Sequence, residues 1–342
     1  MDQNSKTINQ AVDESVNLIE QSREREIITR RFGLKEKRET LEEIGAFLSI
    51  TRERVRQLEK AITIRLRLAA EDNDIPALAA AEKMIVRNLT ELGRVATIEK
   101  LGQKIYGREA SREELSSLVF IASISSVLTY LPDSDSYFAA IGISEYGDEK
   151  KLKERVDEIV KLIRANKKPM SIQELDNALS YEHPDHIRAI ASISKLLSSL
   201  NDNWGLVSWP SVNPKNIRDK IYVVLENNKE PMHFKDIAKT IQTSKLRRSN
   251  VTEQAIHNEL IKDERFILIG RGIYALKAWG YEPGTVKDII IRTMKAAKKP
   301  LTREQIVKAV LKARNVKETT VLLSLQDKKT FKKLDKNSYT LA

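Results

Sequence analysis

The segment TLEEIGAFLSI, at residues 40–50, has the apolar spacing of a short amphipathic helix. Leu41, Ile44 and Leu48 fall at i, i+3 and i+7 and form one apolar face. Thr40 can cap this helix, and Glu43 can complete a capping box by accepting a hydrogen bond from the Thr40 amide. The pattern therefore predicts a helix that begins just after Thr40.

A second helix is predicted to follow at once, in the segment TRERVRQLE. Thr51 starts it, and Val55 and Leu58 fall on its inner face. Gly45, in the first helix, lets the second helix approach closely. The spacing predicts a helix-turn-helix with a polar outer face on its second helix. The residues of this segment that we expect to bind DNA are Thr51, Arg52, Glu53, Arg54, Arg56, Gln57 and Lys60.

These side chains have the chemistry of a recognition helix. Arginine pairs with the O6 and N7 atoms of guanine, glutamine with adenine and glutamate with the cytosine amine, while lysine binds phosphate. Arg54 and Lys60 are accordingly expected to hold the DNA backbone. The residues expected to read bases are Arg52, Glu53, Arg56 and Gln57. The alternative interpretation is a charged, solvated helix on an unrelated bundle.

Three motifs in order, REREIITRRFGL, TLEEIGAFLSI and TRERVRQLEKAITIRLR, resemble region 4 of bacterial sigma-70-type sigma factors. The resemblance covers about residues 22–70, and the family's first-helix signature corresponds to Arg30, Arg31, Phe32 and Gly33. It implies two partners, which are double-stranded DNA at the upstream promoter element and the β-subunit flap of bacterial RNA polymerase. Nothing in the chain resembles the aromatic-rich sigma region that grips polymerase and melts DNA, so a complete sigma factor is not expected.

After residue 80 one pattern recurs four times, in GRVATIEKLGQKI, KKPMSIQELDNAL, KEPMHFKDIAKTI and KKPLTREQIVKAV. Alignment of Ala96, Met170, Met232 and Leu301 separates the copies by 74, 62 and 69 residues. In the last three copies a proline precedes the aligned residue, where it ends a helix and keeps its neighbour extended. Each copy predicts two helices, a third helix and a two-stranded β-rich tail, which is the layout of a winged helix.

Two of these tails, NWGLVSWP and GRGIYALKAWGYEPG, resemble the wing of the HARE-HTH domain. Gly270 and Gly272 fit a tight hairpin turn between its strands. This winged helix occurs in the δ subunit of bacterial RNA polymerase, and the resemblance covers about residues 150–281. It implies the fold, with contact to DNA or to polymerase. The acidic tail typical of the δ subunit is absent, and basic residues dominate the end of this chain.

The chain is therefore expected to be mainly α, with a sigma region 4 helix-turn-helix followed by tandem winged-helix domains of three helices and a small β-wing. The expected divisions are a helical or flexible lead at 1–21, the helix-turn-helix at 22–70, a linker at 71–80, a winged-helix-like unit at 81–147, a HARE-like winged helix at 148–215, a HARE-HTH winged helix at 216–284 and a basic winged-helix-like unit at 285–342.

The net charge of +11 is unevenly distributed. Residues 285–342 hold 15 basic and 5 acidic residues, a net charge of +10, whereas residues 71–147 hold 7 and 12, a net charge of −5. A basic surface attracts phosphate without selecting a sequence. We expect phosphate contacts from the C-terminal unit. The basic segments KLRRSN at 245–250 and KKTFKKLDK at 328–336 could touch DNA, or could be solvated surface.

Other classes of protein are not expected. The chain has no Cys, and it shows no Gly-rich phosphate loop, no nucleophilic serine motif and no nuclease-like carboxylate pair, so neither an enzyme nor a cofactor site is predicted. His183 and His186 lack a third ligand, so no metal site is predicted. No apolar window is long enough to cross a membrane, and the polar N-terminus is unlike a signal peptide. A cytoplasmic, nucleoid-associated bacterial protein is expected; its oligomeric state stays open.

The sequence thus favours a sequence-specific DNA-binding transcription factor of the sigma region 4 type, acting at the upstream promoter element with RNA polymerase. Two alternatives stay open. One is a δ-like polymerase-binding adaptor with little DNA contact, and the other is an architectural protein that binds DNA without sequence preference.

Overall fold

A computed structural model describes residues 3–179, 184–244, 251–281, 284–314, 316–334 and 337–342. The fold is mainly α with small antiparallel sheets, as the sequence predicts. The chain divides into two compact units, Met1–Ser208 and Trp209–Ala342, and each is described by itself. No helix among the described residues is long and apolar enough to span a membrane.

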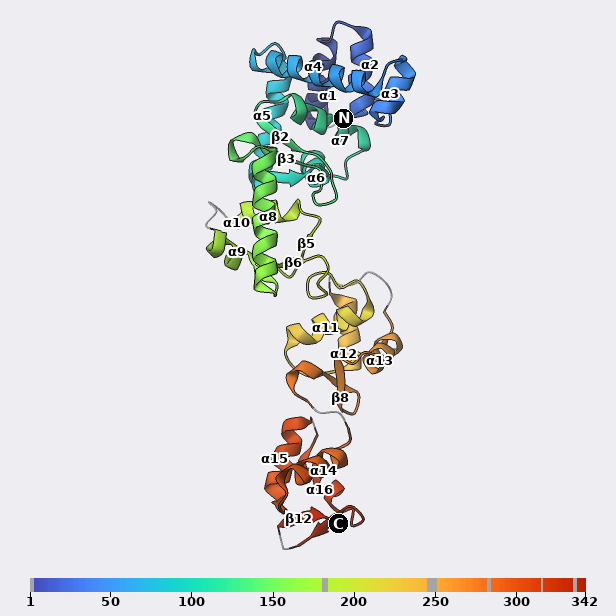
Figure 1. Ribbon diagram of the computed structural model, residues 1–342, viewed down its shortest axis with the longest axis vertical. Coiled ribbons are helices and arrows are strands. Elements are labelled where there is room, and N and C mark those ends of the chain that lie inside the picture. The colour runs from blue at the N-terminus through green and yellow to red at the C-terminus, as the bar shows by residue number, and fades with distance from the viewer. Residues whose placement is uncertain (1–2, 180–183, 245–250, 282–283, 315, 335–336) are drawn as a thin grey trace. The chain divides into compact units, whose positions relative to one another are not determined.

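The predicted helix-turn-helix is present (Figure 1), and consists of α2 (Ser22–Phe32), α3 (Leu41–Leu48) and α4 (Arg52–Glu71). The capping box of Thr40 and Glu43 is confirmed, and the Thr51 hydroxyl accepts a hydrogen bond from the Arg54 amide. A Cβ atom on Gly45 would lie 2.7 Å from the carbonyl oxygen of Ile50, so the close approach at this glycine is confirmed. The small core of the motif contains Ile27, Ile44 and Val55, all fully buried.

The first winged helix comprises α5 (Pro76–Glu91), β1 (Val95–Thr97), α6 (Ile98–Tyr106), α7 (Arg112–Ile124), β2 (Leu128–Leu131) and β3 (Ala140–Ile143). It shares one hydrophobic core with the end of α4 and with α1 (Gln3–Asn17), which packs along α5 and α7. Buried side chains from distant elements meet there, and the rings of Phe32 and Phe120 are 5.2 Å apart. The helix-turn-helix is therefore built onto the first winged helix.

This arrangement differs from the expected divisions at two places. Residues 1–21 contain a helix whose Ile8 and Ala11 are fully buried, so the segment is part of the core. Residues 76–80, assigned to a linker, are helical, because α5 begins at Pro76. Proline is favourable in the first turn of a helix, where its missing amide hydrogen costs nothing.

The second winged helix comprises α8 (Glu149–Asn166), β4 (Met170–Ser171), α9 (Ile172–Leu179), α10 (Pro184–Ser192), β5 (Leu197–Leu200) and β6 (Asn203–Leu206). The third comprises α11 (Ile217–Asn228), β7 (Met232–His233), α12 (Phe234–Thr243), α13 (Glu253–Lys262), β8 (Phe266–Gly270) and β9 (Ile273–Leu276). The fourth comprises α14 (Val286–Ala297), β10 (Leu301–Thr302), α15 (Arg303–Ala313), α16 (Glu318–Leu325), β11 (Phe331–Lys333) and β12 (Ser338–Leu341).

The expected two-stranded tails are wrong, because each unit has a three-stranded sheet within the described residues. The strand orders are β1-β3-β2, β4-β6-β5, β7-β9-β8 and β10-β12-β11. The four aligned residues, Ala96, Met170, Met232 and Leu301, all lie in the first strand of their own sheets. This short extended segment, which follows proline in three copies, pairs with the last strand of the wing and closes the unit.

The third helices of the first two copies are shorter than expected. The segments taken as single helices contain α7 followed by β2, and α10 followed by β5. Continuous apolar runs such as IASISSVLTYL do not distinguish a buried helix from a buried strand by periodicity, and tertiary pairing decides the boundary.

Candidate nucleic-acid interface

The outer face of the first half of α4 is open to solvent. Val55 points inward and is fully buried, while Leu58 and Glu59 are partly buried. The side chains on the remaining positions are all exposed, and they are those of Thr51, Arg52, Glu53, Arg54, Arg56, Gln57 and Lys60. The structure thus brings every predicted DNA-binding residue to one end of one helix.

The Glu53 carboxylate organises this face. Arg56 donates to it from Nε at 2.9 Å and from Nη2 at 2.7 Å, and Gln57 donates from Nε2 at 3.5 Å. Arg54 in turn donates to the amide oxygen of Gln57 at 3.4 Å. The bonds from Arg56 lower the pKa of Glu53 and raise that of Arg56, so both groups are charged at neutral pH. In the free protein, the fork of Arg56 is therefore occupied by Glu53.

The other half of α4 is held in place by the rest of the unit. Ile62 and Leu66 are buried in the shared core, and Arg67 donates to the carbonyl oxygen of Ser123 at 2.8 Å. Arg65 forms an ion pair with Glu24 of α2. These contacts fix the direction of the exposed half relative to the first winged helix.

The arginines of the first-helix signature support the motif from within. Arg30 bonds to Glu26 at 2.5 Å and to Glu39 at 2.7 Å, and its guanidinium lies 3.8 Å from the ring centre of Phe47. Arg31 pairs with Glu59 of α4 at 3.1 Å. These structural roles were not apparent from the sequence, because most of their contacts come from separate segments of the chain.

The third helices of the first two winged helices are covered by the chain itself. Most of α7 is buried against α1, α2 and α4. Helix α10 packs on β1, where Nδ1 of His186 lies 2.8 Å from the carbonyl oxygen of Gly93. A winged helix commonly inserts this third helix into the DNA groove. In these two copies, that surface is occupied.

The third helices of the last two copies are exposed but poorly suited to phosphate. On α13 the exposed positions include Glu253 and Ile261, and the single basic residue is Lys262. Helix α16 contains no Lys or Arg, and its Leu323 is 66% exposed. Neither face has the Arg and Gln pattern of α4.

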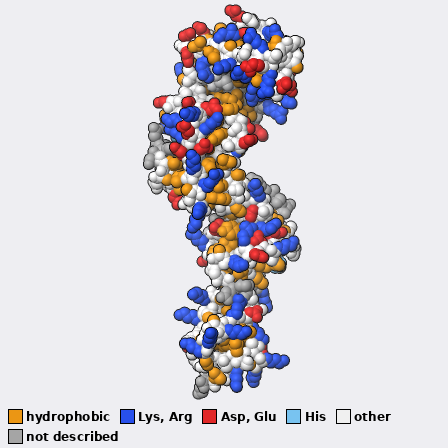
Figure 2. Space-filling model, viewed as in Figure 1, with side chains coloured by type: hydrophobic (Ala, Val, Ile, Leu, Met, Phe, Trp, Pro, Cys, Tyr) orange, Lys and Arg blue, Asp and Glu red, His pale blue; other side chains and the backbone are white. Residues whose placement is uncertain are grey.

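Positive charge instead gathers elsewhere on the C-terminal unit, where Figure 2 shows Lys and Arg side chains with few acidic neighbours on the face drawn. Lys332 and Lys333 are exposed on β11, which is an edge strand of its sheet. Further exposed lysines of this unit are Lys295, Lys298, Lys299, Lys308, Lys312, Lys328 and Lys329. The basic segment at 245–250 lies outside the described residues.

The histidine that the sequence offered for a metal has another function. His186 is buried, with Arg155 bonded to its Nε2 atom at 2.8 Å. His183 lies outside the described residues. Among the described residues, no cluster of three or more His, Asp or Glu side chains could hold a metal ion.

Comparison with known families agrees with this architecture. Residues 21–68 match the model of sigma-70 region 4, and residues 217–279 match that of the HARE-HTH domain, a helix-turn-helix domain whose description names ASXL and restriction endonuclease. No curated protein matches the chain. Both matched families are DNA-binding helix-turn-helix families and neither is an enzyme family. The chain thus joins a sigma-70 region 4 domain to a HARE-HTH domain, which makes it a DNA-binding helix-turn-helix protein.

Proposed function

We propose that this protein is a sequence-specific transcription factor that reads the upstream promoter element through the exposed half of α4 and acts with RNA polymerase in initiation or its regulation. One observation carries the proposal: a capped helix start projects seven polar side chains while the other half of the same helix is anchored in a core. A rigid support of this kind favours base readout, because a fixed helix loses little freedom on binding.

The residues have distinct roles in this proposal. Arg52, Glu53, Arg56 and Gln57 contact base edges in the major groove, with Arg56 exchanging Glu53 for guanine. Arg54 and Lys60 contact phosphates, which position the helix without carrying sequence information. The Thr51 hydroxyl is engaged in the cap, so Thr51 acts by fixing the helix start, whose amide groups also favour phosphate.

The winged helices then divide into two functions. The first two support the reading helix, since their own third helices are covered. The fourth contributes phosphate contacts from its basic surface. These contacts raise affinity on any duplex and are weakened by salt.

Fluorescence anisotropy tests this proposal with two duplexes, one carrying a consensus upstream promoter hexamer and one scrambled, at several salt concentrations. We expect a preference of about tenfold or more for the consensus duplex. The Arg56→Ala variant should lose about 1–3 kcal/mol on the consensus duplex alone. Arg87→Ala is the matched control, because Arg87 is an 83% exposed arginine on α5, outside the reading face. Equal losses on both duplexes would contradict base readout by Arg56.

A polymerase-binding adaptor is the second candidate, and the apolar exposed faces of α13 and α16 favour it. Leu323 and Ile261, which are 66% and 64% exposed, suit contact with protein better than with phosphate. Co-purification with RNA polymerase that survives a combined Arg52→Ala and Arg56→Ala change would support this function. An architectural protein would instead bind both duplexes equally and lose both as salt rises.

A further inference from the structure

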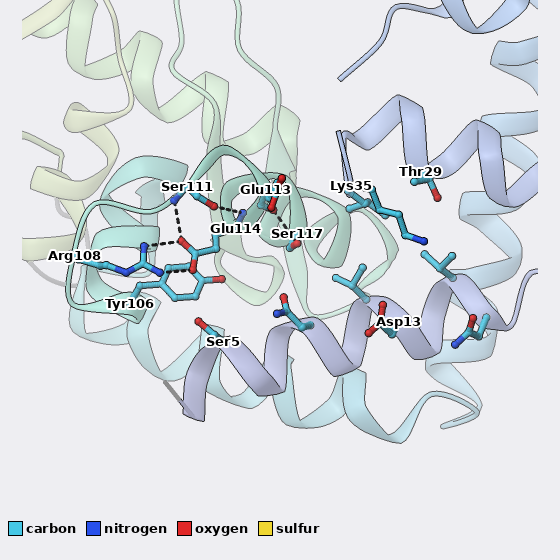
Figure 3. A pocket seen from close by; sticks show the side chains of 15 residues that line it. Ser5, Asp13, Thr29, Lys35, Tyr106, Arg108, Ser111, Glu113, Glu114 and Ser117 are labelled. Carbon is cyan, nitrogen blue, oxygen red and sulfur yellow. Dashed lines mark hydrogen bonds and ion pairs between the residues drawn. The ribbon is translucent and has the colours of Figure 1, made fainter. Parts of the chain in front are cut away.

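A polar cleft of about 600 Å³ lies between the helix-turn-helix, α1 and the first winged helix. One wall is α1, and the opposite wall is the start of α7 together with the end of α6 (Figure 3). Thr29, Leu34 and Lys35 close one end from α2 and the turn that follows it. None of the lining residues belongs to the reading face of α4, so the cleft is a separate site.

The Tyr106 hydroxyl points into this cleft (Figure 3). Its side chain is nearly fully buried, with 7% of the residue exposed, and its hydroxyl has no hydrogen-bond partner within the described part of the chain. A buried polar group without a partner costs about 1–3 kcal/mol, so native proteins seldom leave one unpaired. Burial raises the pKa of Tyr106 above its ordinary value, which keeps the hydroxyl protonated and able to donate and accept.

The charges around the cleft are only partly neutralised. Arg108 and Glu114 pair with each other at 2.6 Å, and the Glu114 carboxylate also accepts from the Ser111 amide at 2.8 Å. Asp13, on α1, and Glu113, on α7, are exposed carboxylates on the two facing walls. Within the described residues, neither carboxylate is engaged in a hydrogen bond or ion pair. The cleft therefore combines unneutralised negative charge with a buried hydroxyl.

We propose that this cleft binds a small metabolite that carries both an ammonium group and hydroxyl groups. The ammonium lies between Asp13 and Glu113, and a ligand hydroxyl or carbonyl oxygen bonds to Tyr106. Asn9 and Ser5 line the same α1 wall and supply further polar contacts. Because the ligand contacts α1, α7 and the turn after α2 together, binding stabilises the union of the helix-turn-helix with the first winged helix. The inference does not depend on the proposed promoter function.

Isothermal titration calorimetry of the full chain tests this site with glucosamine, its neutral analogue glucose, and the diamine putrescine. We expect glucosamine to bind at least about tenfold more tightly than glucose, a difference of about 1.4 kcal/mol. Putrescine should bind more weakly than glucosamine, because it offers no hydroxyl to Tyr106. Thermal denaturation should show a ligand-dependent rise in melting temperature that follows the same order.

Two variants separate this site from adventitious binding. Asp13→Asn should weaken glucosamine binding about tenfold, and Tyr106→Phe should weaken it several-fold at an unchanged shape. Asp135→Asn removes an exposed carboxylate outside the cleft and should change nothing. Circular dichroism verifies that each variant is folded. The proposal is overturned if neither amine binds, if glucose binds as well as glucosamine, or if both cleft variants bind as the unchanged protein does.

Discussion

Nδ1 of His186 lies 2.8 Å from the carbonyl oxygen of Gly93, and this contact joins the second winged helix to the first. The guanidinium of Arg155 lies 2.8 Å from the other ring nitrogen. Because arginine can only donate, Nε2 accepts and Nδ1 carries the hydrogen that is donated to Gly93. Both partners of the ring thus select one neutral tautomer and one orientation of α10 on β1.

Gly93 is the position at which this joint is most sensitive to substitution. Its φ of +92° disfavours any side chain, and a Cβ atom would lie 2.4 Å from the carbonyl oxygen of Asp185. Gly93→Ala should lower the free energy of unfolding by about 2–4 kcal/mol, as strain and overlap combine. Urea denaturation measures this loss. Gly107→Ala is the control, with a φ of +66° but no atom within 4 Å of the new Cβ, and should cost about 1–2 kcal/mol. Equal losses would show that overlap at the joint is unimportant.

Glu53 is predicted to restrain Arg56 in the free protein and to reduce binding to incorrect sequences. Glu53→Gln removes the ion pair and one negative charge from the reading face. We expect affinity for scrambled DNA to rise and the ratio of consensus to scrambled binding to fall, as measured by anisotropy at constant salt. Glu42→Gln makes the same charge change at an exposed position on α3. If that variant had the same effect on the ratio, general charge would be the cause.

The capping box gives a pH dependence with a definite sign. The Thr40 amide bonds to Glu43 and lowers the pKa of that carboxyl below its ordinary value of 4.5. A group with a lowered folded pKa adds stability above its unfolded pKa, and this stability is lost as the pH falls through the folded value. The contribution of Glu43 should therefore be complete at neutral pH and decline below about pH 4.5. Carboxyl-carbon NMR titration measures the pKa, which should return toward 4.5 in the Thr40→Ala variant.

The basic surface of the fourth winged helix should control the salt dependence of DNA binding. Changing Lys332 and Lys333 together to Gln should reduce the slope of log affinity against log salt by up to about 2, roughly 1 for each lost phosphate contact. The preference for the consensus duplex should remain. Changing Arg87 and Lys150 to Gln removes two exposed charges from the other unit and is the control. An unchanged slope in the Lys variant would place the phosphate contacts elsewhere.

The helix-turn-helix was predictable because its signals are local. Capping by Thr40 and Thr51, the apolar spacing of Ile44 and Val55, and the tight turn at Gly45 all depend on residues within a few positions of one another. The repeat was also visible, although the sequence suggests only a bend where its first strand forms. A strand of two or three residues has too little periodicity to be recognised, and it forms only because the wing is there to pair with it.

Residue types and helical period were enough to identify the helix with the chemistry to read DNA, because together they place its polar side chains on one face. Long-range packing decided the rest: α7 and α10 are covered, α1 belongs to the shared core and the Tyr106 hydroxyl faces a cleft. Each of these depends on contacts between segments tens of residues apart, such as Ile105 with Asn4 and Gly93 with His186. Burial of that kind depends on how whole elements pack, and no local pattern specifies it.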